Sequence, residues 1–333
     1  MDQDSGAGAA STPLPVLNQH PRRWRVRSSW GAERPQQRGV DLRHEKPSDE
    51  GSTIGHHDGM ESKPMPGEFA HLLVKTDGLC WWCRSAKADT GEHKFKRASL
   101  ARLMGDGPAL IWGDGTSVRE LRGKAGITRD RYRVVKFPKS MCAACNNSRS
   151  QPFDIAYDTY EEFVSGHLLR LMPGIGLGPL YGPSWQADSL NLARYHAKHF
   201  GCRMVRAGLP VPQSLRDFLN GDSDMPDAHM AIVTTDEVNR VYGNGLYMGP
   251  DFVYVDVDST RFTAFVMAAY IGSIGVRYEW REEGIPEEER SQFFHYAQPV
   301  INTFRTELDM AMGRPRKPGW FARLTQWAST PVR

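Results

Sequence analysis

Apolar residues at helical spacing predict two helices in the middle of the chain. The first covers residues 154–164, where four apolar side chains recur at roughly helical spacing: Ile155, Tyr160, Phe163 and Val164. The second covers residues 189–199. Gly201 is expected to end this second helix, because glycine commonly follows the last helical turn.

Strand-like patterns begin near residue 228. Residues 230–235 and 252–257 are rich in β-branched residues and are predicted strands. The apolar stretch 261–280 fits a strand or a helix on pattern alone. Residues 286–304 are predicted to be helical, because three acidic residues in the first turn suit the positive end of the helix dipole. Helices followed by strands predict an α+β protein.

Composition divides the chain into four parts. Residues 1–66 are rich in Ser, Gly, Pro, Gln and charge, without sustained apolar periodicity, and are predicted to be a disordered tail. Residues 67–165 contain four cysteines and are predicted to form a metal-bound domain. Residues 166–312 are predicted to form a helical and then mixed α+β domain of unknown role. Residues 313–333 form a basic C-terminal tail.

Hydropathy predicts a cytoplasmic protein that is not embedded in a membrane. No apolar run approaches the roughly 20 residues of a membrane-spanning helix. A basic and then apolar leader segment does not follow Met1. The formal net charge is only +3, so the distribution of charge is more informative than its sum.

Four of the five cysteines form two C-x-x-C pairs, which are Cys80 with Cys83 and Cys142 with Cys145. Each spacing lets one tight turn present two thiolates to a tetrahedral ion. In a cytosolic protein such pairs are more typical of metal ligands than of disulfides. The sequence therefore predicts a structural zinc ion bound by all four.

Polar residues beside the cysteine pairs form a second pattern. Glu92-His93 follows the first pair, and Asn146-Asn147 directly follows the second. This order resembles the zinc-supported HNH endonuclease family over roughly residues 78–152. The resemblance implies a treble-clef-like zinc core with a ββα-metal element. In that element a β-hairpin carries the acidic residue and the histidine, and the next helix starts at the second cysteine pair.

The resemblance also implies a role for each residue. His93 would be the general base that activates water. Glu92 and Asn146 would hold a catalytic Mg²⁺ or Mn²⁺, with Asn147 as the alternative to Asn146. Arg149 would bind a flanking phosphate. The implied activity is metal-dependent hydrolysis of DNA phosphodiester bonds.

Basic residues between the cysteine pairs support a DNA partner. Residues 84–144 hold 14 Lys or Arg against 6 Asp or Glu, a local excess of 8, so the rest of the chain carries about −5. Phosphate contacts supply most sequence-independent affinity for DNA. The candidate phosphate-binding residues lie in one extended segment and are Arg129, Arg131, Arg133, Lys136 and Lys139. A solvated strand face is the other interpretation of this segment.

A non-catalytic zinc module that binds nucleic acid or a protein partner is the alternative function. The middle Asn of the HNH family is absent from residues 136–141, and Glu92 stands where the family more often has Asp. Both hypotheses share the cysteines and the basic charge. They differ in whether Glu92, His93 and Asn146 converge on one ion.

Overall fold

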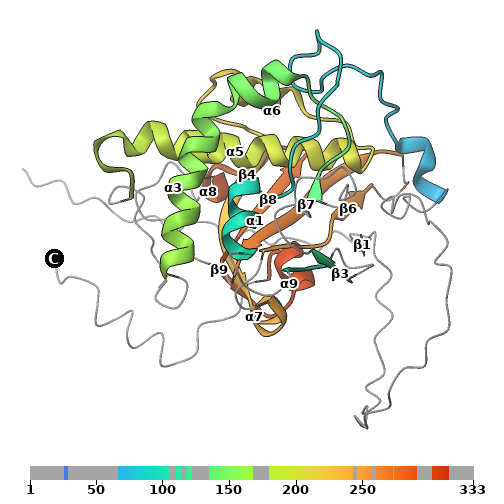
Figure 1. Ribbon diagram of the computed structural model, residues 1–333. Coiled ribbons are helices and arrows are strands. Elements are labelled where there is room, and N and C mark those ends of the chain that lie inside the picture. Colours follow the sequence, from blue (N-terminus) through green and yellow to red (C-terminus); the bar gives the residue numbers. More distant parts are fainter. Residues whose placement is uncertain are drawn as a thin grey trace, which may run out of the picture.

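A computed structural model describes the chain in several ranges (Figure 1). The described residues are 26–28, 67–104, 110–113, 118–121, 135–167, 180–242, 246–256, 258, 260–272, 274–290 and 302–314. The predicted C-terminal tail lies outside them apart from Gly313 and Arg314. The predicted N-terminal tail also lies outside them, except for one short strand.

A twisted sheet forms the centre of the described structure. Its strands are β1 (Val26–Ser28), β4 (Ala228–Thr235), β5 (Leu246–Met248), β6 (Phe252–Val255), β7 (Phe262–Ile271), β8 (Ile274–Arg281) and β9 (Asn302–Phe304). Their spatial order is β1-β6-β7-β8-β4-β9, and β5 also pairs with β7. Only β4 and β9 pair in parallel; the other described pairs are antiparallel. A separate ribbon pairs β2 (Leu110–Gly113) with β3 (Val118–Leu121).

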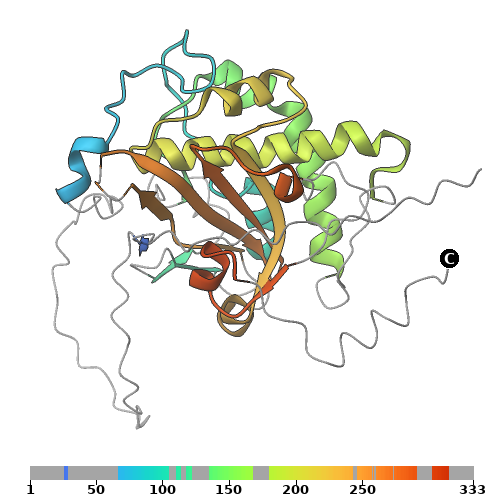
Figure 2. The same cartoon turned by 180° about the vertical axis from the view of Figure 1, so that it is seen from behind.

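Two long helices, α3 (Gln151–His167) and α5 (Trp185–Arg206), cover one face of this sheet (Figures 1 and 2). Tyr157 of α3 stacks on Tyr195 of α5 with ring centroids 3.8 Å apart. Phe200 of α5 stacks on Phe265 of β7 at 5.4 Å. Stacked aromatic pairs of this kind bury large apolar areas and fix the helix against the strands. No helix among the described ranges combines the length and the apolar composition needed to cross a bilayer.

Shorter helices surround this core. They are η1 (Gly67–Leu72), α1 (Arg97–Met104), η3 (Ala144–Arg149), η4 (Gly182–Ser184), α6 (Gln213–Asn220), α7 (Asp236–Tyr242), α8 (Glu287–Arg290) and α9 (Glu307–Ala311). On the face opposite α5, Met310 of α9 packs into a second apolar cluster with Phe252 and Val266 of the sheet. Both faces of the sheet are therefore covered.

The cysteine-bearing segment shares its hydrophobic core with the sheet. One cluster of buried residues contains Trp82 and Cys145 together with Phe200, Phe265 and Trp280. The boundary placed between residues 165 and 166 therefore does not coincide with a break in the core. The mixed helix and sheet content confirms the predicted α+β class.

Several predicted elements are present. The helix α3 covers the range predicted from residue 154, and β4 and β6 coincide with the two predicted strands. The undecided stretch 261–280 forms the antiparallel strands β7 and β8. Gly272 lies between them with a φ of +55°, a conformation that a residue without a Cβ adopts easily.

Other predicted elements differ from the structure. The helix predicted over residues 286–304 is present at Glu287–Arg290, which form α8, but the prediction is wrong for residues 302–304, which form β9; residues 291–301 lie outside the described ranges. Pairing with the edge of β4 overrides the local helical pattern there. Val26–Ser28, expected to be disordered, pairs with β6. Ile155 was expected on the apolar face of its helix but is 59% exposed.

Gly201 does not end its helix, which continues to Arg206. A Cβ at Gly201 would overlap the indole ring of Trp81, so the glycine makes room for the residue between the first two cysteines. The tertiary contact, rather than a helix end, explains why glycine stands here.

Replacing Gly201 by Ala should therefore destabilise the protein by about 1–3 kcal/mol through overpacking. The matched control is Gly166→Ala in α3, where nothing lies within 4 Å of the new methyl group. That change should stabilise by up to about 1 kcal/mol, because Ala is the better helix former. Denaturant unfolding of both variants measures the difference. Equal effects at the two positions would contradict the role of the Trp81 contact.

Candidate metal centre and catalytic site

The first cysteine pair lies on a tight turn held by backbone hydrogen bonds. The amide of Cys80 donates to the carbonyl of Ala86 at 2.7 Å, and the amide of Arg84 donates to the carbonyl of Cys80 at 2.9 Å. Arg84 takes a positive φ of 56° to close this turn. The amide of Trp81 donates to the carbonyl of Ser140 at 3.0 Å. This last bond ties the first turn to the segment that precedes the second pair.

The second cysteine pair lies where a helix begins. Cys145 is within η3, a π-helical turn that leads into α3. The amide of Asn146 donates to the carbonyl of Cys142 at 3.0 Å, and the amide of Cys145 lies 3.5 Å from the Cys142 sulfur. A backbone amide at this helix start thus faces the Cys142 sulfur.

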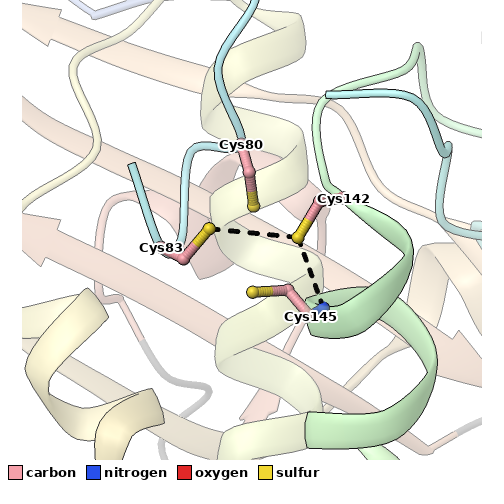
Figure 3. A group of neighbouring side chains, drawn as sticks. All are labelled: Cys80, Cys83, Cys142 and Cys145. Carbon is pink, nitrogen blue, oxygen red and sulfur yellow. Dashed lines mark hydrogen bonds between the residues drawn. The ribbon is translucent and has the colours of Figure 1, made fainter. Parts of the chain in front are cut away.

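All four thiols point toward a common centre (Figure 3). Their Sγ atoms lie within 4.8 Å of one another, and those of Cys83 and Cys142 are 3.9 Å apart. All are free cysteines. A tetrahedral zinc ion with Zn–S bonds of about 2.3 Å separates its sulfurs by about 3.8 Å. The four cysteines could therefore hold a metal ion such as zinc. Within the described ranges, no other group of three or more His, Cys, Asp or Glu residues comes this close together.

Arg149 lies beside this cluster instead of extending freely from the helix. Its Nη1 is 3.7 Å from the Cys145 sulfur, and its Nη2 donates to Oδ1 of Asn220 at 2.7 Å. The guanidinium also stacks over the Trp82 ring, 4.7 Å from the centroid. A zinc ion with four thiolates carries a net charge of about −2, so a neighbouring cation is favourable. The predicted phosphate contact of Arg149 thus competes with three protein contacts.

Two isolated antiparallel bridges pair residues 90–93 with residues 136–141; we call this paired segment the hairpin, and α1 and the β2–β3 ribbon lie between its two arms in the sequence. His93 forms an antiparallel bridge with Lys136, and Thr90 forms one with Met141, directly before Cys142. The chain therefore passes from the first turn into the hairpin, and from the hairpin into the helix. This path sets Glu92-His93 on one element and Asn146 on the next.

The Glu92 side chain is 13% exposed and its carboxylate contacts α5. Its Oε2 lies 3.4 Å from Nζ of Lys198, and its Oε1 lies 3.4 Å from Nε2 of His199. Burial works to raise the pKa of Glu92, but the charge of Lys198 and the neighbouring His199 outweigh it and lower the pKa to about 2. Glu92 is therefore ionised at neutral pH, as a metal ligand must be.

His93 is half-buried on the hairpin. Burial, with the nearby charge of Lys136, lowers its pKa below the ordinary value of 6.5, although Glu92 acts in the opposite direction. The imidazole is therefore neutral at pH 7 in the described structure. A neutral imidazole can accept a proton, which is the property that a general base requires.

Asn146 has a buried side-chain oxygen without a hydrogen-bond donor. Its Oδ1 has no partner in the structure, although its backbone carbonyl accepts from the Ser150 hydroxyl at 2.8 Å. A buried acceptor that lacks a donor costs about 1–3 kcal/mol, so this oxygen is available to a ligand that would satisfy it. Asn147, the alternative ligand, is exposed.

No protein-family model, curated protein or solved structure matches this chain. The assignment of the site therefore depends on its own geometry. Among the predicted DNA-contacting residues, Lys136 and Lys139 are exposed on the hairpin strand that leads to Cys142. The other three of that segment lie outside the described residues: Arg129, Arg131 and Arg133.

Lys198 and His199 were not predicted from the sequence to be part of this site. The available signal was a lysine inside the mostly aromatic and apolar run of residues 195–200. A lysine on a helix face that is buried must have an anionic partner. The pattern could not say which carboxylate that partner is, because Glu92 lies more than 100 residues away in the chain.

Proposed function

We propose that the chain hydrolyses DNA phosphodiester bonds through an HNH-like site that depends on a divalent ion. The support begins with the order of elements. A cysteine turn, a hairpin with Glu92-His93, and a helix that starts at the second cysteine pair follow one another. This is the order expected of a treble-clef-like core with a ββα-metal element.

The single observation that carries the proposal is the buried Oδ1 of Asn146. It has no hydrogen-bond donor, and it belongs to the residue that the resemblance assigns to the ion. An amide oxygen and an ionised carboxylate such as that of Glu92 are oxygen donors of the kind that Mg²⁺ or Mn²⁺ takes. The chemistry of these two groups therefore suits such an ion. When bound, the ion would stabilise the negative charge that builds on the scissile phosphate.

The protein's own groups supply the remaining parts of the reaction. His93, neutral at pH 7, would accept the proton of the attacking water. Lys136 pairs with His93 across the hairpin and is exposed, so it could hold a phosphate of the DNA strand beside that base. The zinc cluster would keep the hairpin and the helix in a constant relative position.

A non-catalytic zinc module that binds nucleic acid or protein is the second candidate. One observation favours it: Lys198 and His199 already share the Glu92 carboxylate. In this hypothesis Glu92 serves only to attach α5 to the hairpin. The unpartnered oxygen of Asn146 is then without explanation, and for this reason we rank the module second.

The test is conversion of supercoiled plasmid to nicked or linear DNA by the full chain with zinc bound. Cleavage should require Mn²⁺ or Mg²⁺ and stop when a chelator removes that ion while zinc is retained. Cleavage that is indifferent to the divalent ion would contradict the proposed site. Binding without any cleavage would favour the non-catalytic module.

DNA binding should weaken steeply with salt. Lys136→Ala with Lys139→Ala should lower the affinity for all sequences alike and reduce the slope of log K against log salt by about 1.8, at about 0.9 per lost phosphate contact. The matched control is Arg240→Ala with Arg305→Ala, two exposed cations outside the zinc segment. Fluorescence anisotropy at several salt concentrations measures both slopes. If the two double variants lose DNA affinity equally, the hairpin face is not the DNA-binding surface.

A further inference from the structure

Lys198 extends from α5 to the junction between the hairpin and the helix after the second cysteine pair. Its Nζ lies 3.4 Å from the Glu92 carboxylate on the hairpin and 3.2 Å from Asp154 on α3. The same nitrogen lies 3.3 Å from the Ser150 hydroxyl, one turn before Asp154. One ammonium group thus contacts both elements of the candidate site.

This ammonium has no access to solvent that could replace its protein partners. The Lys198 side chain is 1% exposed. A buried ammonium needs anionic partners, and the carboxylates of Glu92 and Asp154 supply them at 3.4 Å and 3.2 Å. Lys198 is therefore a fixed positive charge that both carboxylates contact.

We propose that the Lys198 ammonium holds the place of a divalent cation in the DNA-free protein and thereby sets how weakly the site binds that ion. The Glu92 carboxylate has one ammonium beside it and one ion to bind, and the two cations repel each other. The approach of a DNA phosphate would add the negative charge that lets both remain. Lys198 is thus a positioning residue that makes ion binding depend on substrate.

The proposal rests on the proposed ion at Glu92 and Asn146, but it does not require that the site cleaves DNA. The repulsion between a unit charge and a divalent ion a few ångströms apart is large at the low effective dielectric of a buried site. Removing the lysine charge should therefore raise ion affinity by about ten-fold or more. A change of that size is easily measured by binding alone.

The experiment measures Mn²⁺ binding to the zinc-loaded full chain without DNA, by the electron paramagnetic resonance signal of free Mn²⁺. Lys198→Gln keeps hydrogen-bond donors for both carboxylates while removing the charge, and Lys198→Arg keeps the charge. We expect about ten-fold or tighter Mn²⁺ binding for Lys198→Gln and wild-type affinity for Lys198→Arg. The double variant Lys198→Gln with Glu92→Gln should lose the gain.

Three results would overturn the proposal. They are unchanged Mn²⁺ affinity in folded Lys198→Gln, an equal gain in Lys198→Arg, and a gain that persists without the Glu92 carboxylate. If Lys198→Gln does not fold, Lys198→Met with Glu92→Gln, which removes both members of the ion pair, provides the folded background. Compared with that double variant, Lys198→Met with Glu92 intact must bind Mn²⁺ more tightly and must have a higher unfolding midpoint in the presence of Mn²⁺. If neither quantity rises, the proposal is overturned. If Mn²⁺ binding changes as expected but the protein does not cleave plasmid DNA, the proposed nuclease activity is rejected. The competition between Lys198 and the divalent cation is then still supported.

Discussion

Removing the metal from the cysteine cluster is expected to unfold the protein. Structural zinc contributes about 10–16 kcal/mol in small zinc-binding peptides, and a whole domain is stable by only about 5–15 kcal/mol. Here the effect should extend beyond the site, because Trp81 and Trp82 between the first two cysteines belong to the same buried cluster as the sheet. Cys142→Ser should therefore abolish folding and activity together.

The measurement is metal content by elemental analysis, with circular dichroism during titration with a chelator. One zinc ion per chain is expected, and its removal should coincide with loss of structure. Cys202→Ala is the matched control: Cys202 is buried and 3.5 Å from the Met141 sulfur, but it is not part of the four-thiol group. The Cys202→Ala variant should retain zinc, and its free energy of unfolding should fall by only about 1–2 kcal/mol. Folded protein with four titratable thiols and no zinc would refute the metal centre.

Loss of His93 should have the largest effect on catalysis. His93→Ala removes the proton acceptor and leaves Glu92 and Asn146 in place, so cleavage should fall about 10²-fold or more while DNA and Mn²⁺ binding persist. Glu92→Ala and Asn146→Ala should behave differently, because each removes a ligand. Part of their activity should return at high Mn²⁺. Single-turnover plasmid cleavage at increasing Mn²⁺ separates the two patterns.

Asn147→Ala is the matched control for Asn146→Ala. Asn147 is adjacent and exposed, and its loss should leave cleavage near the wild-type rate. A larger loss at Asn147 than at Asn146 would transfer the ligand role to Asn147. Cleavage by His93→Ala at the wild-type rate would exclude His93 as the base.

The pH dependence of cleavage gives a second measure of the same base. Because burial and Lys136 lower the pKa of His93 from 6.5, the imidazole is neutral over a wider range than a free histidine. The acid limb of kcat/KM, which reports the DNA-free protein, should therefore lie below pH 6.5. Lys136→Ala should shift this limb upward, since it removes one of the charges that disfavour the imidazolium.

Local chemistry determined much of what the sequence predicted correctly. The C-x-x-C spacing requires a tight turn that presents two thiols, and two such turns in one chain favour a single four-thiol centre. Helical periodicity predicted α3, and β-branched content predicted β4 and β6, which are buried at almost every position because both faces of the sheet are covered. These inferences depended only on residues close together in the chain.

Tertiary structure decided what depends on distant contacts. Gly201 has the local pattern of a helix end, but the ring of Trp81 packs against it and the helix continues. Residues 302–304 have a helical context, but the open edge of β4 draws them into the sheet. Local propensities of less than about 1 kcal/mol per residue cannot outweigh such contacts.

In the candidate site, too, some features follow from the local sequence and others only from tertiary contacts. The sequence by itself established the order of Glu92, His93 and Asn146 relative to the cysteines, and the resemblance to the HNH family assigned their roles. Only the folded chain placed Lys198 and His199 against Glu92, and Arg149 against Cys145. Their charges interact through space over a few ångströms, while about 100 residues separate Glu92 from Lys198 along the chain. Electrostatic pairing follows that spatial distance, and only the tertiary structure sets it.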